Sequence, residues 1–282
     1  MGTSTSSKGG KKGSPFDPEW LTPDSDSDAG GGGDRSPDGQ ANGDSADGDT
    51  QGDDADGQDT SDSISASPRY GSAKASISSY LGGGGHGALK SAVRKMVNSG
   101  MGGARRATST TRATAAGAGQ LGSFLAAARD GTSQEVTNWV ANVRAQNLPA
   151  SELILEIIKE VMPDSGSLDD ESLRGAAADA LAELYEENPG VDVFQLTNEQ
   201  IDEVIAITVA NEVCNRMDLQ LGQAYEKLKY DARQIQDFRN DMREYVQGQV
   251  RVVMEQPGMR GHPPEVLAKN VHSMAWKVFG SE

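Results

Sequence analysis

The first residues of the chain carry a group that could be acylated. The sequence opens with Met1 and Gly2, and small polar residues follow as far as Gly10. A small second residue allows the initiator Met1 to be removed, which exposes the α-amine of Gly2. That amine has a reference pKa of about 7.7–8.0, against about 10.4 for lysine, so a useful neutral fraction exists at pH 7. The sequence therefore predicts Gly2 as an open nucleophile for acyl transfer.

Two other interpretations of these residues stay open. The first is an ordinary unstructured terminus. The second is N-myristoylation, because the pattern M-G-x-x-x-[ST] is matched with Ser6 in its last position. A single acyl chain needs a second membrane signal. Lys8, Lys11 and Lys12 form only a sparse basic patch, and a run of aspartates follows them. We therefore expect no membrane attachment.

A short apolar group follows the glycine head. Phe16, Trp20 and Leu21 are the large apolar side chains between Gly2 and residue 62, and Pro15 and Pro18 lie among them. Prolines at this density favour an extended, polyproline-like segment. Side chains of this kind have no local core to join, so docking into a groove of a partner protein is their natural use. Chance aromatics in a linker are the alternative.

Catalytic patterns are absent from the sequence. It contains no G-x-x-x-x-G-K-[ST], no H-E-x-x-H and no G-x-S-x-G. The lone Cys214 excludes an internal disulfide framework and a thiolate zinc site, and its apolar neighbours indicate a core residue. His262 and His272 are interpreted as structural or surface residues. We therefore predict a protein that is not an enzyme and that holds no cofactor or metal.

The charge distribution divides the chain into four parts. Residues 1–23 form the head, with a net charge of +1, and residues 24–62 carry thirteen aspartates and one arginine. Residues 63–130 hold nine Lys or Arg, and large aliphatic residues are concentrated in residues 131–282. The aspartates repel one another and have no apolar partners, so we expect a disordered, extended spacer there.

The basic part is predicted to be mostly disordered, with one short amphipathic helix around Lys90, Arg94 and Lys95. A basic stripe over residues 69–112 is typical of nucleic-acid binding. However, no aromatic residues are interleaved with it to stack on bases, so nucleic acid is possible but not favoured. The acidic C-terminal domain of the same chain, or an acidic protein surface, is at least as good a partner.

The C-terminal part has a hydrophobic period of 3.6, which predicts a helical bundle. The fold class is therefore all-α, with a long disordered N-terminal region before the bundle. Several local signals mark where helices begin and end. Capping boxes at Thr132–Glu135 and Thr197–Gln200 and a serine cap at Ser167 predict helix starts. Pro257-Gly258 predicts a break, and Pro263-Pro264 predicts the start of the last helix. A long helix is expected from about Ala224 to Glu255. No apolar run of 18 residues and no secretory signal are present, so we expect a cytoplasmic protein.

These features resemble the QatB family of the bacterial Qat antiphage defence system. The resemblance rests mainly on the head, and in pattern on two later stretches; the residues are Met1 to Ser6, Ser14-Pro15, Pro18, Trp20-Leu21, Gly82–Gly85 and Leu196–Gln200. It implies companion proteins: an ATPase, a QueC-like (QatC-like) enzyme and a TatD-like nuclease.

The resemblance also implies a role for the head as a substrate. QueC-like enzymes activate a 7-deazaguanine carboxylate with ATP, and in defence systems the acceptor is a protein N-terminal glycine. By this resemblance Gly2 is the acceptor, and the partner recognises flanking residues in the head, which are Thr3, Ser4, Thr5, Ser6, Pro15, Phe16, Pro18, Trp20 and Leu21. The competing hypothesis is a basic nucleic-acid-binding or sensing protein of a defence system.

Overall fold

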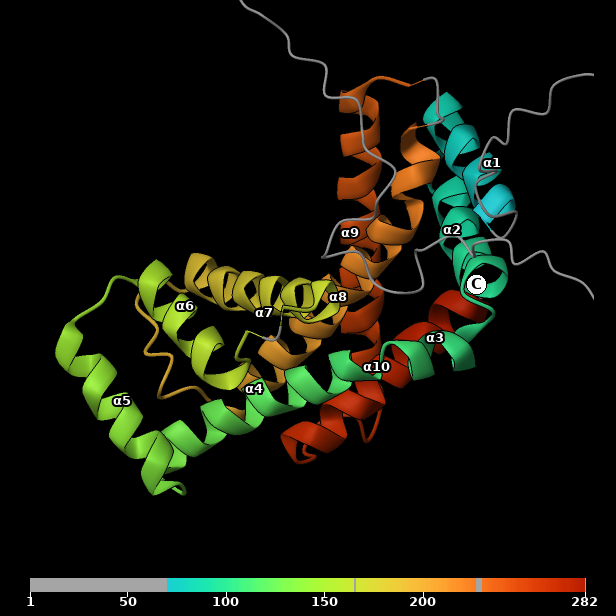
Figure 1. The fold of residues 1–282 in the computed structure, drawn as a ribbon. Coiled ribbons are helices and arrows are strands. Elements are labelled where there is room, and N and C mark those ends of the chain that lie inside the picture. Colours follow the sequence, from blue (N-terminus) through green and yellow to red (C-terminus); the bar gives the residue numbers. More distant parts are fainter. Residues whose placement is uncertain (1–69, 165, 227–229, 282) are drawn as a thin grey trace, which may run out of the picture. The chain divides into compact units, whose positions relative to one another are not determined.

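The computed structural model describes residues 70–164, 166–226 and 230–281. The chain divides into two units between Asp59 and Thr60, and all described residues belong to the second unit. The predicted head and acidic spacer therefore lie outside the described residues. Every regular element within the described part is a helix, which confirms the all-α fold class (Figure 1).

The basic part of the chain is helical, and its predicted disorder is wrong for residues 70–130. Its elements are α1 (Gly71–Ser79), η3 (Tyr80–Gly84), α2 (Gly85–Lys95), η4 (Met96–Gly100), α3 (Ala104–Thr110) and α4 (Arg112–Asp130), where η3 and η4 are π-helical turns. The expected amphipathic helix is α2, which buries Leu89 and Val93. No domain boundary separates this part from the rest, because α4 packs against α8 and α10.

Small residues explain why this part folds. Helix α4 buries Gly117, Gly119 and Gly122. A Cβ atom on Gly119 would lie 2.9 Å from the backbone Cα of Glu265, so glycine there allows α4 and α10 to approach closely. Composition alone suggested disorder because Gly and Ala supply little apolar area per residue. In the structure, α4 and α10 approach closely at Gly119, and the large side chains of Leu173 and Ile205 pack against Gly117 and Gly122.

The next helices follow the predicted apolar stripes. They are α5 (Gln134–Gln146), α6 (Ala150–Val161), α7 (Leu168–Glu187) and α8 (Asn198–Glu226). Ser167 caps α7 as predicted, because its side chain accepts a hydrogen bond from the Asp169 amide. The capping box before α8 is confirmed as well: Thr197 and Gln200 exchange side-chain and backbone hydrogen bonds. At α5 the cap is Ser133, one residue after the predicted Thr132.

The predicted long helix from about Ala224 is wrong at its start. Helix α8 continues to Glu226, and α9 (Ala232–Met254) begins after Asp231. The side chains of Asp231 and Gln234 each accept a backbone hydrogen bond from the other residue, which makes a capping box. The box sets the start of α9, and the sequence pattern had continued across it. The last helix, α10 (Pro264–Ser281), starts at the predicted Pro-Pro pair.

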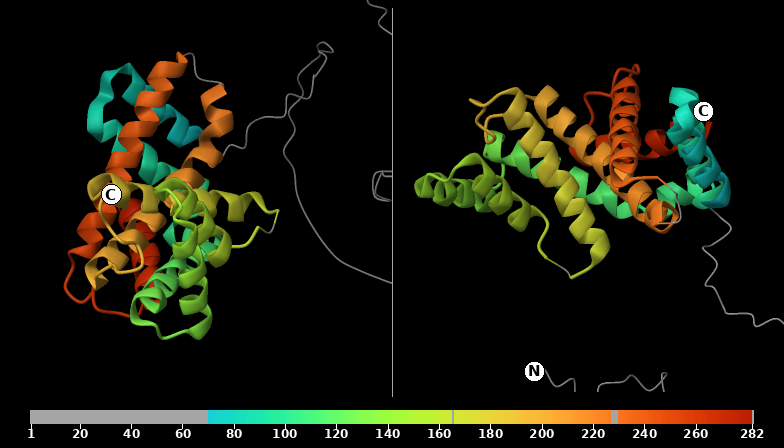
Figure 2. Two further views of the ribbon diagram at one scale, coloured as in Figure 1. Left: turned by 90° about the vertical axis from the view of Figure 1, so that its left-hand side faces the viewer. Right: turned by 90° about the horizontal axis from the view of Figure 1, so that it is seen from above.

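Helix α8 lies at the centre of the helical body. It packs against α4, α7, α9 and α10, and most of its residues from Ile201 to Met217 are buried. The turn η3 and helix α2 lie beside α9, and Tyr230, between α8 and α9, donates a hydrogen bond to the Ser78 carbonyl of α1 (Figures 1 and 2). Among the described residues, no helix is long and apolar enough to cross a membrane.

Candidate functional site: polar networks and a basic surface

The ten residues predicted for modification and partner binding all lie outside the described residues. They are Gly2, Thr3, Ser4, Thr5, Ser6, Pro15, Phe16, Pro18, Trp20 and Leu21. Their roles stay predictions. The described helices show what the body of the protein can contribute, and four places and one separate cleft in it could carry chemistry or recognition.

The first place is the single thiol. Cys214 is buried in α8, which agrees with its interpretation as a core residue. Burial raises the pKa of the thiol to about 12, so the sulfur is protonated at pH 7 and is a poor nucleophile. A cleft of about 340 Å³ borders it, and polar side chains line that cleft, among them Asp218 and Arg239. These two form a fork-like ion pair with N–O distances of 2.7 and 2.5 Å.

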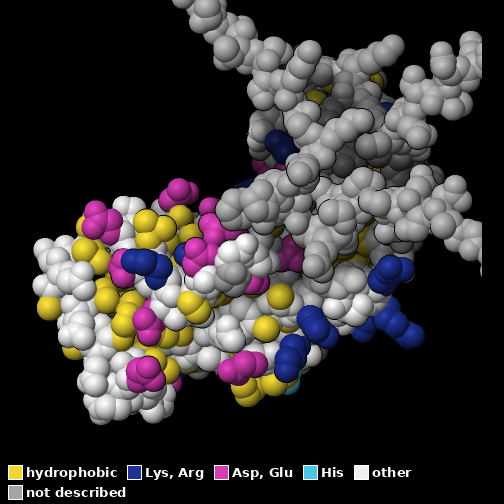
Figure 3. Space-filling view, viewed as in Figure 1, with side chains coloured by type: hydrophobic (Ala, Val, Ile, Leu, Met, Phe, Trp, Pro, Cys, Tyr) yellow, Lys and Arg dark blue, Asp and Glu magenta, His cyan; other side chains and the backbone are white. Residues whose placement is uncertain are grey.

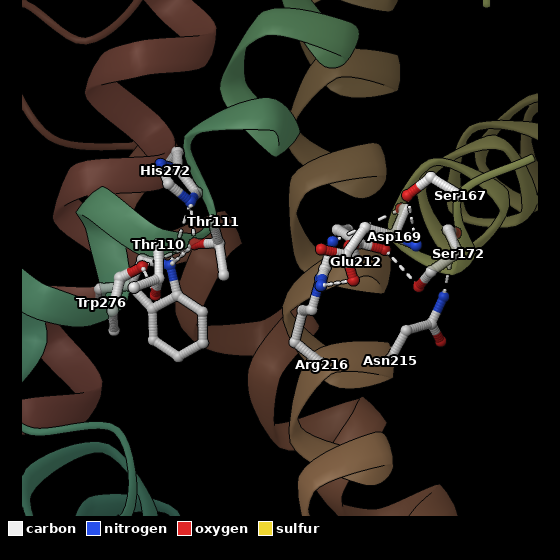
Figure 4. A network of polar contacts seen from close by, with 11 residues as sticks. Thr110, Thr111, Ser167, Asp169, Ser172, Glu212, Asn215, Arg216, His272 and Trp276 are labelled. Atoms are coloured by element: carbon white, nitrogen blue, oxygen red, sulfur yellow. Dashed lines mark hydrogen bonds and ion pairs between the residues drawn. The ribbon is translucent and has the colours of Figure 1, made fainter. Parts of the chain in front are cut away.

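The second place is a buried network between α3, α4 and α10 (Figure 4). His272 Nε2 lies 2.8 Å from Thr111 Oγ1, and the Trp276 indole N–H donates to both atoms, at 3.0 Å to His272 and 3.1 Å to Thr111. All three side chains are buried. Burial lowers the pKa of His272 to about 4, so the imidazole is neutral at pH 7 and its Nε2 accepts from the Trp276 indole N–H, while the Thr111 hydroxyl donates to the Ala107 carbonyl at 2.8 Å.

The third place is a charged network where the start of α7 meets α8 (Figure 4). The Glu212 side chain is fully buried. It accepts hydrogen bonds from Ser172, at 2.7 Å, and from the Arg216 guanidinium, at 2.5 Å. Arg216 also pairs with Asp169 in the first turn of α7. Burial raises the pKa of the Glu212 carboxyl, and the donors Ser172 and Arg216 oppose that shift.

Both networks position helices. In each one, hydrogen bonds within and between neighbouring helices join the buried polar side chains. Among the described residues, no three His, Cys, Asp or Glu side chains gather in a way that could hold a metal ion. Sequence reasoning had treated His272 as structural or surface; the structure assigns it to the core.

A second cleft, of about 310 Å³, lies between α5, α6 and the loop before α8. Arg144 pairs with Asp192 at 2.6 Å in this cleft. The same guanidinium lies 5.5 Å from the centre of the Phe194 ring, which is a cation–π distance.

The fourth place is a basic surface, defined here as Arg105, Arg106, Arg112, Lys269 and Lys277. All five side chains belong to exposed residues, on α3, at the start of α4 and on α10, and these three helices pack together. Figure 3 shows Lys and Arg side chains gathered over this side, whereas Asp and Glu side chains lie mainly over α5 to α7. The arginines of this surface make no ion pair with any described residue.

The fold and these places define a class: an all-α protein whose described polar clusters join its helices. The chain belongs to the QatB family. The family model described as "Qat anti-phage system associated protein QatB" matches residues 102–273. This confirms the resemblance inferred from the sequence and makes the protein a component of the Qat antiphage system.

The matched region is the helical body from the turn before α3 into α10. It includes Leu196–Gln200, where Leu196 is buried and Thr197 and Gln200 cap α8. It does not include the head, on which the sequence-based resemblance mainly rested. No curated protein and no solved structure matches the chain.

Proposed function

We propose that this Qat component is a protein substrate, which presents Gly2 to a QueC-like partner for attachment of a 7-deazaguanine group. The proposal rests on a head that resembles that of QatB, joined to a body that matches the QatB family. The head offers a terminal glycine amine within small polar residues, and the body offers surfaces for protein contact.

The chemistry is an acyl transfer. The partner consumes ATP, releases pyrophosphate and forms an acyl adenylate of the deazaguanine carboxylate. The neutral amine of Gly2 attacks the acyl carbon, an N–C bond forms, AMP leaves, and the nitrogen loses a proton. The low reference pKa of an α-amine supplies the neutral nucleophile at pH 7. Neither a base nor a metal from this chain is required.

The helical body serves as the docking module in this proposal. Support comes from the described nucleophile candidates, because the Cys214 thiol is buried and protonated and the His272 imidazole is buried in the core with its Nε2 hydrogen-bonded. A body built in this way holds its partner and leaves the bond-forming step to the enzyme. Trp20 and its neighbours would then anchor the head in the partner.

Intact mass spectrometry of the full chain, coexpressed with the other Qat proteins, tests the proposal. We expect a mass without Met1 and with one added 7-deazaguanine acyl group. Omitting the QueC-like protein should return the unmodified mass. An unmodified Gly2 amine on active protein would refute the proposal, and a myristoyl mass at Gly2 would favour membrane attachment.

Two variants at the head sharpen the test. Gly2→Glu should abolish the added mass, because a bulky second residue retains Met1 and a side chain blocks the approach of the amine. The matched control is Gly9→Glu, which adds the same charge to the same segment and leaves the terminal amine free. It should keep the modification. Equal loss in both variants would show that charge in the head, and not the glycine amine, decides the outcome.

A further inference from the structure

We propose that the basic surface binds double-stranded DNA through the phosphate backbone, without a preference for sequence. The surface is a property of the helical body, and its use does not depend on the modification of Gly2. The support comes from how charge is distributed over the helices, from where the arginines lie in them, and from the size and composition of the surface.

Charge is divided unevenly between the helices of the body. Helices α3, α4 and α10 together carry six Lys or Arg and two acids, whereas α5, α6 and α7 carry three Lys or Arg and twelve acids. In Figure 1, α5 and α6 lie at the left and α3 lies at the right, near the C-terminus. Charges are screened over about 10 Å at about 0.1 M salt, so a polyanion at α3 meets the local cations rather than the net charge of −16.

The arginines of the basic surface have no counter-charge in the body. Arg105, Arg106 and Arg112 make no ion pair with any described residue. Several carboxylates on α6 and α7 are already paired within the body; the pairs are Glu156–Lys159, Glu171–Arg174 and Asp169–Arg216. The acidic face of a second copy would have to give up these pairs, whereas a DNA duplex presents about one unpaired negative charge per 1.7 Å of its axis.

The three arginines lie where a cation opposes helix formation. The first turn of an α-helix favours Asp or Glu, because the helix dipole places positive partial charge there. Helices α5, α6, α7, α8 and α10 each carry an acid in the first turn. Helices α3 and α4 carry none; instead Arg105 and Arg106 lie in the first turn of α3, and Arg112 is the first residue of α4. Since local stability does not account for these cations, their placement favours a role in binding an anion.

Helix α10 adds its lysines to the same surface because it runs antiparallel to α3. Near the end of α10, a Cβ atom on Gly280 would lie 3.3 Å from the Cβ atom of Ala104, at the start of α3. One turn earlier on α10, the Trp276 indole donates to Thr111, which directly follows α3. Lys277 lies between these two contacts, so it is level with the arginines of α3.

The size of the surface suits a few phosphates of a duplex. Seven residues separate Arg105 from Arg112, and eight separate Lys269 from Lys277. At about 1.5 Å per helical residue, each of these two rows spans about 10–12 Å. One DNA strand advances about 3.4 Å along the axis per phosphate, so a row can lie beside about three phosphates. Arginine contacts a phosphate through paired N–H donors, which makes this contact a strong one.

The composition of the surface favours a duplex over a single strand. Proteins that bind single strands stack the bases on exposed aromatic side chains. The aromatic residues of α3, α4 and α10 are Phe124, Trp276 and Phe279, of which Trp276 and Phe279 are buried. Phe124 is half-buried and packs edge-on against Trp139. The basic surface therefore offers cations for the backbone and no platform for bases.

The hydroxyl groups beside the arginines favour DNA over RNA. Ser109 and Thr110 both donate to the Arg106 carbonyl, at 2.9 and 3.0 Å. These hydroxyls are used within the helix and do not supply a donor for the 2′-hydroxyl, the group that distinguishes RNA from DNA.

Fluorescence anisotropy of a labelled 20-base-pair DNA duplex, about two helical turns, tests the proposal with the full chain expressed without other Qat proteins. Release of counterions from about three to five phosphates should raise the dissociation constant about 40- to 500-fold between about 50 mM and about 200 mM salt. A second duplex of unrelated sequence should bind equally well. Absence of binding at about 50 mM salt, or a dissociation constant that does not change with salt, would overturn the proposal.

The charge-reversed variant is Arg105→Glu with Arg106→Glu and Arg112→Glu. The matched control reverses three exposed cations on other helices and changes the net charge by the same amount; its changes are Lys159→Glu, Arg233→Glu and Arg251→Glu. We expect the charge-reversed variant to lose affinity at least about tenfold and to show a shallower dependence on salt, and the control to stay within about threefold of the parent. Equal losses in the two variants would show that net charge governs binding, and would overturn the proposal.

A second variant guards against a loss of fold. Arg105→Gln with Arg106→Gln and Arg112→Gln removes the charges without reversing them, and circular dichroism shows whether the helices are kept. This variant should lose affinity as well. A folded glutamine variant that binds DNA as the parent does would overturn the proposal.

An RNA duplex and an acidic protein surface are the competing occupants. The same sequence is therefore tested as an RNA duplex, and poly-L-glutamate is added to the DNA complex as a carboxylate competitor. Tighter binding of the RNA duplex, or displacement of the DNA by poly-L-glutamate at equal concentration of charge, would overturn the proposal. None of these results bears on the mass of Gly2, so this proposal and the proposed function can fail separately.

Discussion

The two buried networks hold the same body together in opposite ways. Around α3, α4 and α10 the backbones of α4 and α10 approach closely at Gly119, and the polar core of Thr111, His272 and Trp276 is neutral. Around α7 and α8 the core contains the fully buried Glu212, held by Arg216. The comparison teaches that a neutral buried network is stable with hydrogen bonds alone, whereas the buried charge of Glu212 requires a counter-charge, which Arg216 supplies.

The largest effect should follow when the counter-charge is removed. Arg216→Met leaves Glu212 buried without its cation, which should cost about 3–5 kcal/mol of unfolding free energy. The control is Arg251→Met, whose exposed pair with Glu203 has an N–O distance of 3.7 Å and should be worth less than about 1 kcal/mol. Urea denaturation measures both values.

The double variant Glu212→Met with Arg216→Met extends this test. Removing both charges should recover most of the loss, because an apolar pair pays no desolvation cost. If the double variant is as unstable as Arg216→Met, the network does not act through its buried charge, and the comparison between the two sides fails.

The next effect tests the close packing. Gly119→Val places a branched side chain against the backbone of Glu265, and overpacking of this kind costs about 2–3 kcal/mol. Gly175→Val on α7 is the matched control, because nothing lies within 4 Å of a Cβ atom there. That change should alter stability by less than about 0.5 kcal/mol. Thermal unfolding of both variants decides, and equal losses would contradict the role given to Gly119.

These glycines also show where sequence reasoning stopped. The apolar stripes of α6 and α7, the box at Thr197 and the start of α10 were all predictable, because they depend on large residues and local hydrogen bonds. The folding of residues 70–130 was not, since its contacts depend on which backbone lies opposite a small residue. The same limit applies to the break before α9, which the capping box at Asp231 sets within an otherwise continuous pattern.

The candidate functional residues likewise fall into those that the sequence could predict and those that depend on how the helices pack. The head residues can be proposed from sequence because an amine near a free terminus needs no fold to be reactive. The basic surface could be suspected from the charge of residues 63–129, but its extension onto Lys269 and Lys277 depends on the packing of α10 against α3 and α4. Nothing in the spacing of Thr111 and His272 indicates that they meet, because 161 residues separate them.

The neutral network predicts a pH dependence. The pKa of His272 is about 4 in the folded protein and about 6.5 in an unfolded chain. The unfolded state therefore takes up the proton first as the pH falls. The stability due to the neutral imidazole is complete above about pH 6.5 and is lost towards pH 4, at about 1.4 kcal/mol per pH unit.

His272→Gln isolates this contribution, because it removes the titrating group and keeps a polar side chain. The difference in unfolding free energy between the parent and the variant should be constant above pH 7 and should shrink between about pH 6.5 and pH 4. Parallel curves across this range would contradict a buried neutral histidine.

The smallest effect concerns the buried thiol of Cys214 on α8. Cys214→Ala should cost about 1 kcal/mol, mainly as lost packing, and should leave antiphage activity intact. Chemical denaturation and a plaque assay measure the two properties. A stable Cys214→Ala protein without activity would give the thiol a chemical role that its raised pKa argues against.

Tandem mass spectrometry of the N-terminal peptide, from chain coexpressed with all Qat proteins, tests the central claim most directly. Fragment ions distinguish the α-amine of Gly2 from the side-chain amine of Lys8, the nearest lysine. The account predicts that Met1 is absent and that the first fragment containing Gly2 alone carries the 7-deazaguanine mass. An unmodified Gly2 fragment, or the added mass on Lys8, would contradict it.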